Sequence, residues 1–371
     1  MRPRSFTAAM AALLILATSL LIRPAIAAPD LATLRLPPGF SIEVWAADVT
    51  NARSLVRGDR GTLFVGTRTA GIVHAVSDSG STRRVRTIAR GLTMPNGVAF
   101  RDGALYVGEL RRILRYDAIE SRLDSPPEPV VIAELPGESH HGWRYIAFGP
   151  DGKLYVAIGA PCNVCDRDAE GYGTIIRMNP DGSGRETVAH GVRNSVGFAW
   201  QPRSLDLWFT DNGRDMLGDD VPSCELNRLS RAGQHFGFPY CHAGDVADPQ
   251  FGDLGRCADA VAPALKLGPH VAPLGLRFYQ GRQFPQRWRG SLFIAEHGSW
   301  NRSQKIGYRV MHVRMDGNRA ASYEEFATGW LRPDGSVTGR PVDLLVLDDG
   351  AMLLSDDVAG VVYRITYRST G

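Results

Sequence analysis

A short apolar run recurs six times along this chain of 371 residues and constrains its fold more than any other feature. Most copies begin with glycine, as in Gly-Thr-Leu-Phe-Val-Gly at residues 61–66. The other copies lie at residues 103–108, 152–157, 205–210, 290–295 and 350–355. A second, alternating strand pattern follows each run, and turn signals such as Pro-Asp-Gly separate the strands. A four-stranded unit that repeats every roughly 40 to 60 residues is typical of a β-propeller.

We therefore expect an all-β, six-bladed β-propeller with four-stranded antiparallel blades. Ring closure gives each blade neighbours for both of its faces and removes long free edges. Two packed β-sandwiches are the alternative, but the regular recurrence of one motif favours the ring. The widest gap between copies holds a segment rich in Gly, Pro and His at residues 233–273, which we interpret as an insertion on one face. Because no Gly/Ser linker divides the chain, we expect residues 28–371 to form a single domain.

The N-terminus has the pattern of a secretory leader. Arg2 and Arg4 precede an apolar stretch at residues 8–22, and Ala-Ile-Ala at residues 25–27 is a small-x-small cleavage site. We expect a signal peptide at residues 1–27 and a periplasmic or secreted protein. A membrane anchor is the alternative, although the apolar stretch is shorter than the roughly 20 residues of a membrane span.

The five cysteines fit an exported protein, because export permits disulfides. Cys162 and Cys165 form a C-x-x-C that lacks the following histidine of a haem attachment site. The simplest pairing is Cys162 with Cys165 and Cys241 with Cys257, which leaves Cys224 as a free thiol. Other pairings of five cysteines stay open.

Polar loops at one end of the ring are the expected location of a site. The net charge of +3, without a basic run, gives no reason to expect nucleic-acid binding. The polar loops lie at residues 139–142, 191–195, 211–215, 296–302 and 339–343. They supply a histidine base, arginines that suit carboxylates, and oxygen ligands that suit calcium. The chain has neither a Ser-His-Asp elbow nor a Gly-rich phosphate loop, so acyl-enzyme chemistry and nucleotide cofactors are not expected.

At these loops the sequence resembles the glucose/sorbosone dehydrogenase family, the soluble six-bladed propellers that use pyrroloquinoline quinone (PQQ). It is most similar to the sorbosone-dehydrogenase-like branch, and the resemblance extends from residue 37 to residue 363. The segments that carry it are Met-Pro-Asn-Gly-Val-Ala-Phe at 94–100, His141 with Phe-Gly-Pro-Asp-Gly at 148–152, His-Gly-Val-Arg-Asn at 190–194, Gly-Gln-His-Phe-Gly-Phe-Pro at 233–239, Gly-Pro-His-Val-Ala-Pro at 268–273, Ala-Glu-His-Gly-Ser-Trp-Asn-Arg at 295–302 and Gly-Arg-Pro-Val-Asp at 339–343.

The resemblance implies a role for each matching residue. His141 is implied as the catalytic base, which takes the hydroxyl proton of the substrate while hydride passes to the C5 carbonyl of the quinone. Arg193 is implied as a catalytic residue that polarises the quinone, with Asn194 at the quinone's edge. The backbone carbonyls of Gly213 and Arg214 are implied as ligands of an active-site calcium. The further implied cofactor contacts are Asn96, Asn212, His297, Arg302, Lys305 and Arg340.

One departure concerns the carboxylate-binding arginines. Val342 stands where the family has a second arginine after Arg340, and Arg302 or Lys305 is expected to replace it. The resulting prediction is an exported PQQ-dependent oxidoreductase that contains calcium and oxidises a sugar of the sorbosone or aldose type. It would pass electrons to an external cytochrome or quinone, with no nucleic-acid partner and no membrane span after signal cleavage.

Two other functions stay open. A metal-dependent, lactonase-like propeller hydrolase would gather Glu109, Asn194, Asp211 and Glu296 around one metal. A non-catalytic binding propeller of the envelope would have no cofactor. Asp211 and Asp356 follow corresponding strands, so a structural role as acceptors of neighbouring backbone amides is also open for them.

Overall fold

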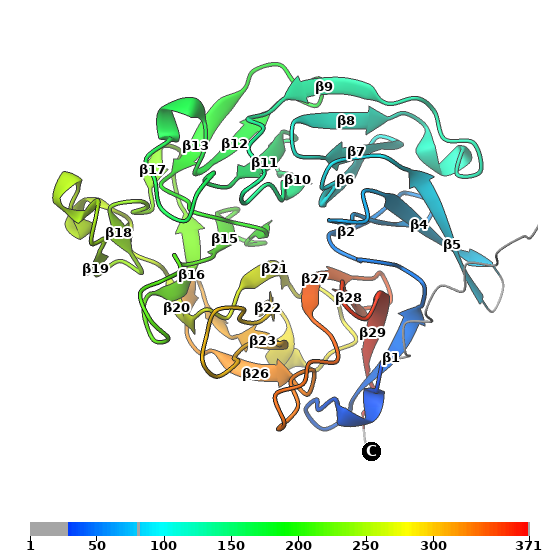
Figure 1. Cartoon of the computed structure of the whole chain (residues 1–371). Helices are drawn as coiled ribbons and strands as arrows, with labels where there is room; N and C mark the ends of the chain where they lie inside the picture. The colour runs from blue at the N-terminus through cyan, green and yellow to red at the C-terminus, as the bar shows by residue number, and fades with distance from the viewer. Residues whose placement is uncertain (1–28, 80–81, 370–371) are drawn as a thin grey trace, which may run out of the picture.

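The computed structural model describes residues 29–79 and 82–369 and confirms the six-bladed β-propeller (Figure 1). The predicted signal peptide, residues 1–27, lies outside the described residues. From the axis outward, the first blade consists of β2 (Leu55–Arg57), β3 (Leu63–Val65), β4 (Val73–Ser79) and β5 (Thr82–Ala89). The second blade consists of β6 (Gly97–Arg101), β7 (Ala104–Gly108), β8 (Arg112–Tyr116) and β9 (Val130–Glu134). The third blade consists of β10 (Ile146–Phe148), β11 (Leu154–Ile158), β12 (Thr174–Met178) and β13 (Glu186–His190). The fourth blade consists of β14 (Phe198–Trp200), β15 (Leu207–Asp211), β16 (Ser223–Leu229) and β20 (Leu265–Pro269). The fifth blade consists of β21 (Pro273–Phe278), β22 (Leu292–Glu296), β23 (Arg309–Val313) and β26 (Glu324–Ala327). The sixth blade consists of β27 (Pro341–Val346), β28 (Met352–Asp356), β29 (Val361–Tyr367) and β1 (Phe40–Ala46).

The recurrent apolar run forms the second strand of every blade. All residues of β3, β7, β11, β15, β22 and β28 are buried. A strand that is covered on both faces has no solvent side, so its sequence is continuously apolar rather than alternating. In each blade, the strand that precedes the apolar run in the sequence pairs with it on its inner side and lines the axis.

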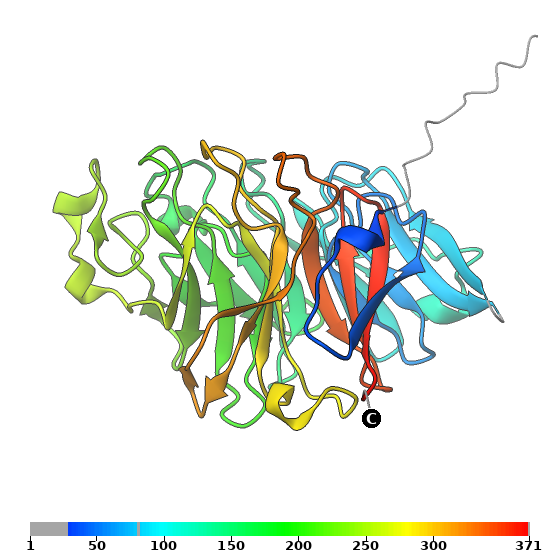
Figure 2. The ribbon, with the colours of Figure 1, turned by 90° about the horizontal axis from the view of Figure 1, so that it is seen from below.

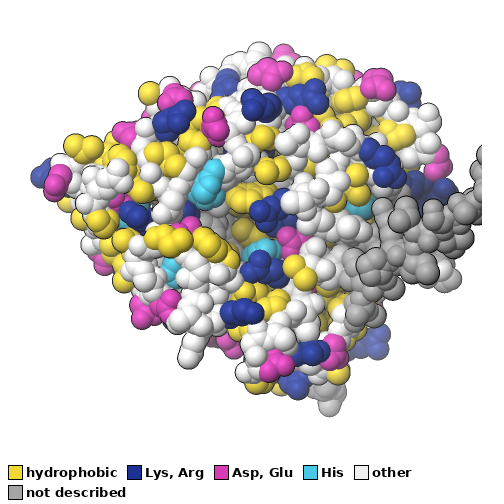
Figure 3. Space-filling model, in the orientation of Figure 1, with side chains coloured by type: hydrophobic (Ala, Val, Ile, Leu, Met, Phe, Trp, Pro, Cys, Tyr) yellow, Lys and Arg dark blue, Asp and Glu magenta, His cyan; other side chains and the backbone are white. Residues whose placement is uncertain are grey.

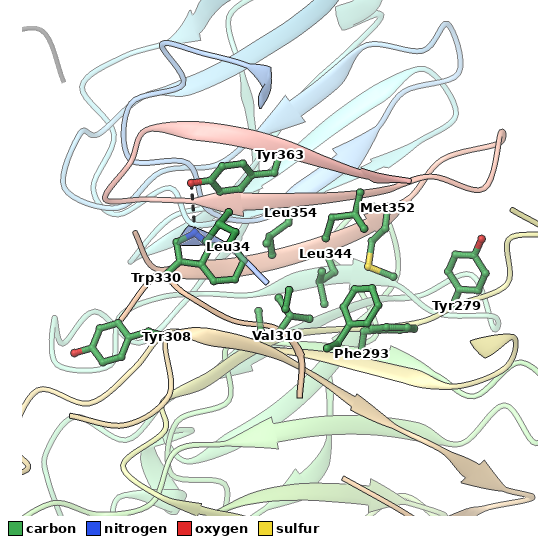
Figure 4. Close-up of a cluster of buried hydrophobic side chains, with 14 of the residues drawn as sticks. Leu34, Tyr279, Phe293, Tyr308, Val310, Trp330, Leu344, Met352, Leu354 and Tyr363 are labelled. Atoms are coloured by element: carbon green, nitrogen blue, oxygen red, sulfur yellow. Dashed lines mark hydrogen bonds between the residues drawn. The ribbon is translucent and has the colours of Figure 1, made fainter. Parts of the chain in front are cut away.

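The hydrophobic core is divided among the six junctions between neighbouring blades. Figure 4 shows the junction of the fifth and sixth blades, where Phe293 and Val310 pack near Leu354 and Tyr363. Burial of one such side chain contributes about 1.5–3 kcal/mol. Each blade therefore depends on both neighbours for its stability.

The two ends of the chain close the ring. β1 pairs antiparallel with β29, from Phe40 opposite Tyr367 to Ala46 opposite Val362. Figure 1 shows β1, in blue, beside β29, in red. The sixth blade therefore joins the first described strand to the last three.

The prediction that residues 233–273 are wholly an insertion is wrong. β17 (Gln234–His235) adds a parallel fifth strand beside β13, and β20 completes the fourth blade. Only the middle of the segment, with the hairpin β18 (Cys241–His242) and β19 (Val246–Ala247), projects from the rim of the ring (Figures 1 and 2). Among the strands that the structure describes, β20 of this segment forms the outer edge of the fourth blade.

Short elements and two disulfides complete the structure. A small hairpin joins β24 (Met315–Asp316) to β25 (Arg319–Ala320). The short 3-10 helices are η1 (Leu31–Thr33), η2 (Ile119–Ser121), η3 (Asp168–Glu170), η4 (Gly252–Leu254), η5 (Cys257–Asp259) and η6 (Gln286–Trp288). In the part of the chain that the structure describes, no helix has the length and apolarity needed to cross a membrane. The expected pairing of Cys162 with Cys165 and of Cys241 with Cys257 is confirmed, and Cys224 is a buried free thiol.

Candidate functional site

The antiparallel register brings the polar loops together at one end of the ring. The start of each first strand lies beside the end of each second strand, as in the pairs Ile146–Val156 and Phe198–Phe209. Loops that precede a first strand and loops that follow a second strand therefore open on the same face. Arginine and histidine side chains gather around the middle of this face (Figure 3).

A cavity of about 160 Å³ opens among these loops. Six predicted residues line it, namely His141, Arg193, Asn194, Asn212, Gly213 and His297. Other walls come from Arg53, Arg68, Trp143, Asp215, His270 and Trp300. The first, third, fourth and fifth blades thus contribute to one cavity, as expected of a propeller site.

His141 is held as a neutral and oriented base. Its Nδ1 lies 2.9 Å from the carbonyl oxygen of Ala160, and because a carbonyl only accepts, Nδ1 carries the proton and Nε2 keeps its lone pair. Burial lowers the pKa of His141 well below 6.5, and the charges of Arg193 and His140 lower it further. A side chain at Gly159 would meet Cβ of His141 at 2.6 Å, so glycine is required there. His141 is therefore able to accept a proton at neutral pH.

The guanidinium of Arg193 is enclosed by five oxygen acceptors. Its Nε donates to the carbonyl of Asn163 at 2.9 Å. Its Nη1 donates to the carbonyls of Asn212 at 3.1 Å and Gly213 at 2.9 Å. Its Nη2 donates to Oδ1 of Asn163 at 2.8 Å and to the carboxylate of Asp215 at 3.1 Å. Since a guanidinium has five N–H groups, Arg193 brings positive charge to the cavity wall but has no spare donor.

Asp211, at the end of β15, fixes the loop that carries Arg193. Its carboxylate accepts the backbone N–H groups of Arg193 at 2.8 Å and Asn194 at 2.6 Å. Burial raises the pKa of Asp211 to about 6, against the opposing effect of these N–H groups. Asp356, at the end of β28, accepts the backbone N–H of Arg340 at 2.9 Å in the same way. The structural role that was open for Asp211 and Asp356 is confirmed.

Arg53 and His297 share the buried carboxylate of Asp357. Nη1 of Arg53 lies 3.0 Å and Nε2 of His297 lies 2.9 Å from its oxygens. Burial acts to raise the pKa of Asp357, but His297 and Arg53 outweigh burial and hold the pKa well below its usual range. Nε of Arg53 also donates to Oδ1 of Asn96 at 2.9 Å, and Asn96 is fully buried. Asn96 therefore orients Arg53 and does not reach the cavity.

Arg68 has a donor to spare in the cavity. Its guanidinium carbon lies 4.4 Å from the ring centroid of Trp143, a distance typical of a cation–π contact. Among the described residues, Nε of Arg68 and Nε1 of Trp143 are buried without a hydrogen-bond partner, and so is the acceptor Oδ1 of Asn194. Buried polar groups without partners are costly, so these three atoms point to a ligand.

The other predicted residues do not line the cavity. Arg214 binds Asp248, and Arg302 donates to the carbonyl of Asp219 and to Asp220. Nζ of Lys305 donates to the carbonyl of Gly335 at 2.7 Å. Nη2 of Arg340 donates to the carbonyls of Gly298 at 3.2 Å and Ser299 at 3.1 Å, so Arg340 supports a loop of the site from outside.

Sequence reasoning missed Arg53 and Arg68, which line the cavity, whereas Arg302 and Lys305 do not. Arg53 precedes the first strand of its blade, as Arg193 and Arg340 do, and Arg68 follows the second strand, as Asn212 does. This shared place in the blade is the signal that would have found both residues. Val342 lies instead in a small buried cluster with Val196 and Leu274.

The carboxylates of the lactonase alternative are each engaged with other partners. Glu109 accepts the backbone N–H of Thr93 at 3.2 Å and pairs with Arg112. Glu296 pairs with Arg309, and Asp211 is taken by backbone amides. Across residues 29–79 and 82–369, no group of three His, Cys, Asp or Glu side chains is arranged to hold a metal ion. The donor set therefore gives no support to a carboxylate-bound metal site.

The cavity fits PQQ but not the predicted calcium. PQQ presents carboxylates and carbonyls, which match the unpaired donors of Arg68 and Trp143. Calcium was expected on the carbonyls of Gly213 and Arg214. The carbonyl of Gly213 already accepts a hydrogen bond from Arg193, and the nearby Asp215 is paired with the same guanidinium. A calcium ion there would face a fixed positive charge that repels it.

Sequence comparisons relate this chain to known proteins. The model of the TrAA12-like family matches residues 34–368. An uncharacterized protein of Borreliella burgdorferi is 34% identical over 350 residues, which cover 90% of this chain and 91% of that protein. A pyrroloquinoline quinone-dependent pyranose dehydrogenase of Coprinopsis cinerea is 34% identical over 137 residues, which cover 31% of this chain and 18% of that protein.

Solved structures share the fold at lower sequence identity. The calcium structure of the Trichoderma reesei family AA12 enzyme matches with a TM-score of 0.75 and 20% identity, covering 92% of this chain and 97% of that chain. The holo PQQ domain of the C. cinerea pyranose dehydrogenase matches with a TM-score of 0.74 and 19% identity, covering 90% and 97%. The PQQ-bound aldose sugar dehydrogenase of Streptomyces coelicolor matches with a TM-score of 0.64 and 19% identity, covering 90% and 100%. The expected resemblance to soluble PQQ-dependent sugar dehydrogenases is confirmed at the level of the fold.

Proposed function

Because the chain belongs to the TrAA12-like family, we propose that it is an exported, PQQ-dependent dehydrogenase that oxidises a sugar. The observation that carries the proposal is the cavity at the centre of the ring, where the neutral base His141 lies among unpaired donors of Arg68 and Trp143. PQQ is a planar tricarboxylate, for which arginine and an aromatic ring are suitable partners. The two disulfides and the leader pattern support export.

The residues of the cavity suit the oxidation of a CH–OH group. When bound, PQQ supplies a two-electron acceptor. His141 would take the hydroxyl proton of the substrate at Nε2 as the carbon that bears the hydroxyl is oxidised to a carbonyl. The carbonyl of Ala160 then stabilises the imidazolium through Nδ1–H. The fixed charge of Arg193 at the cavity wall would stabilise negative charge on a group bound beside it.

We propose a sugar of the aldose or sorbosone type as substrate. The named relatives that support this choice act on pyranose and aldose sugars. Trp300, which is 68% exposed at the cavity wall, offers an apolar face to a sugar ring. The chain has no C-x-x-C-H haem motif, so we propose that electrons leave to an external cytochrome or quinone.

The test combines cofactor binding with turnover. The purified protein is titrated with PQQ by calorimetry and then assayed with a redox dye and a panel of aldoses. We expect PQQ binding and sugar-dependent dye reduction, with His141→Ala lowering the rate by about 10²–10⁴-fold. His190→Ala is the matched control, because His190 binds Asp168 outside the cavity.

The outcomes separate the candidate functions. Loss of turnover with retained PQQ affinity in His141→Ala identifies the base. PQQ binding without oxidation of any sugar would indicate a binding propeller. The absence of PQQ binding at micromolar concentration would contradict the proposal.

A further inference from the structure

The five oxygen acceptors of the Arg193 guanidinium form a cage around it. They come from two loops that are hydrogen-bonded to each other. One is the segment between Cys162 and Cys165, whose disulfide closes a short loop around Asn163. The other carries Asp215, at residues 211–215. Oδ1 of Asn163 accepts the backbone N–H of Asp215 at 2.9 Å, and Nδ2 of Asn163 donates to the carbonyl of Asp215 at 3.1 Å. The acceptors of the guanidinium are therefore fixed before any ligand arrives.

Arg193 is also held by hydrogen bonds at its backbone N–H and by an ion pair at its guanidinium. Its N–H is bound by Asp211, and the side chain is 4% exposed. One oxygen of Asp215 pairs with Arg193, and the other accepts Nδ2 of Asn301 at 3.0 Å. A swing of the guanidinium out of the cage would take this donor away from the carbonyls of Asn163, Asn212 and Gly213 and would separate the carboxylate of Asp215 from its cation. Such a move is strongly unfavourable.

The same oxygen set is what a calcium ion would need. Calcium takes six to eight oxygen ligands, mostly carbonyls and carboxylates. Here Asn163, Asn212, Gly213 and Asp215 offer that kind of donor, and all four already bind one guanidinium. The cage therefore already holds a cation, which is the guanidinium of Arg193.

We propose that Arg193 takes the place of a metal ion and that this protein binds its quinone cofactor without calcium. Asn163 is a positioning residue that holds Arg193 in this role. The inference rests on the proposed function for the identity of the cofactor, but the occupancy of the cage by Arg193 is independent of it.

The first experiment measures calcium directly. The full-length purified protein is treated with EDTA, transferred to metal-free buffer and titrated with calcium alone by calorimetry, with metal content checked by mass spectrometry. We expect no stoichiometric calcium in the wild type. Stoichiometric calcium binding by the wild type would overturn the inference, whether or not PQQ binds.

A gain of function provides the positive arm. Arg193→Ala empties the cage and leaves its oxygen atoms free, so we expect this variant to bind calcium and to gain thermal stability from it. Calcium binding by Arg193→Ala but not by the wild type supports the inference. An equal response of both proteins contradicts it.

The cofactor arm then tests the role of Asn163. We expect PQQ to bind the wild type equally in EDTA and in calcium, whereas a requirement for calcium would overturn the inference. Asn163→Ala should lower PQQ affinity by about tenfold or more, because the side chain loses its hydrogen bond from the Arg193 guanidinium and both of its hydrogen bonds to the backbone of Asp215. Asn163→Asp, which keeps the acceptors, should recover part of the affinity. Asn179→Ala, in a turn where Nδ2 binds Ser183, is the matched control and should leave PQQ affinity unchanged.

If PQQ binds neither in EDTA nor in calcium, the proposed function fails, while the calcium titration still decides the inference.

Discussion

His141 and Arg193 lie on one cavity wall, but their surroundings give them opposite tasks. The carbonyl of Ala160 fixes the ring of His141 and leaves Nε2 free, while burial keeps the ring neutral. Arg193 has every donor engaged and keeps its charge. The site thus holds a base that is able to move a proton beside a cation that does not move. Neither property is visible from residue type alone.

The protonation state of His141 is measurable by NMR. In protein with ¹⁵N-labelled histidine, we expect His141 to stay neutral with the proton on Nδ1 between about pH 8 and pH 6. In the unfolded chain, the imidazole of His141 takes up a second proton near pH 6.5, whereas in the folded protein it stays neutral at this pH. Acidification below pH 6.5 therefore lowers the free energy of unfolding. Formation of the imidazolium of His141 near pH 6.5 in the folded protein would contradict this account. His141→Ala assigns the signal.

Arg68 is expected to hold a carboxylate of the cofactor. Arg68→Ala should lower PQQ affinity by about 10–100-fold, because hydrogen bonds between charged groups are worth about 1.5–3 kcal/mol. Calorimetric titration with PQQ measures the change. Arg287→Ala is the control, since Arg287 also stacks on a tryptophan, with its guanidinium carbon 5.3 Å from the Trp288 ring centroid, but lies outside the cavity. Equal affinity of Arg68→Ala and the wild type would exclude this role.

Among the strands and loops, several blades place their site residues with the same device. A carboxylate at or just after the end of a second strand accepts the backbone N–H of the loop ahead of the first strand. Asp211 does this for Arg193, Asp356 for Arg340 and Glu109 for Thr93. The device explains why these carboxylates are unavailable as metal ligands. It also ties the position of the site residues to the integrity of each blade.

The two disulfides are expected to serve different purposes. Loss of the Cys241–Cys257 bridge should lower the free energy of unfolding by about 3 kcal/mol, and loss of the shorter Cys162–Cys165 loop by about 2 kcal/mol. PQQ affinity should show the opposite order, because Asn163 lies inside the shorter loop and holds Arg193. Urea unfolding and PQQ titration of the two double serine variants measure both effects. A larger loss of PQQ affinity without Cys241–Cys257 would contradict this assignment.

For the whole molecule, closure of the ring by β1 is the critical feature. Phe40 at the start of β1 contacts four aromatic rings, namely Phe284, Trp288, Phe326 and Tyr367. These rings belong to the junction of the fifth and sixth blades. The closing strand is therefore held by side-chain packing as well as by its pairing with β29.

Phe40→Ala should weaken this closure. We expect a loss of about 2–4 kcal/mol in the free energy of unfolding, somewhat less than for a fully buried phenylalanine because Phe40 is half-buried. The urea midpoint and the melting temperature measure the effect. Val130→Ala, at an exposed position of β9, is the control and should change both values little. A similar small effect of Phe40→Ala would mean that backbone pairing alone closes the ring.

The sequence predicted the ring better than it predicted the site. The six apolar runs identify the six buried second strands, because a strand packed on both faces leaves a continuous apolar signature. The outer strand β20 was missed, since a solvent-facing edge strand carries a weaker pattern. Within the site, His141 and Arg193 were placed at the cavity, whereas Arg302 and Lys305 were not. Which arginine points inward depends on competing acceptors such as Asp219, and these are set by tertiary contacts.

The most direct test of the central claim is the absorption spectrum of the PQQ-loaded protein under anaerobic conditions, recorded before and after addition of an aldose. We predict that the sugar converts the bound cofactor to its reduced form in the wild type. His141→Ala should bind the cofactor and leave it oxidised on the same timescale. An unchanged spectrum of the PQQ-loaded wild type with every aldose tested would contradict the account.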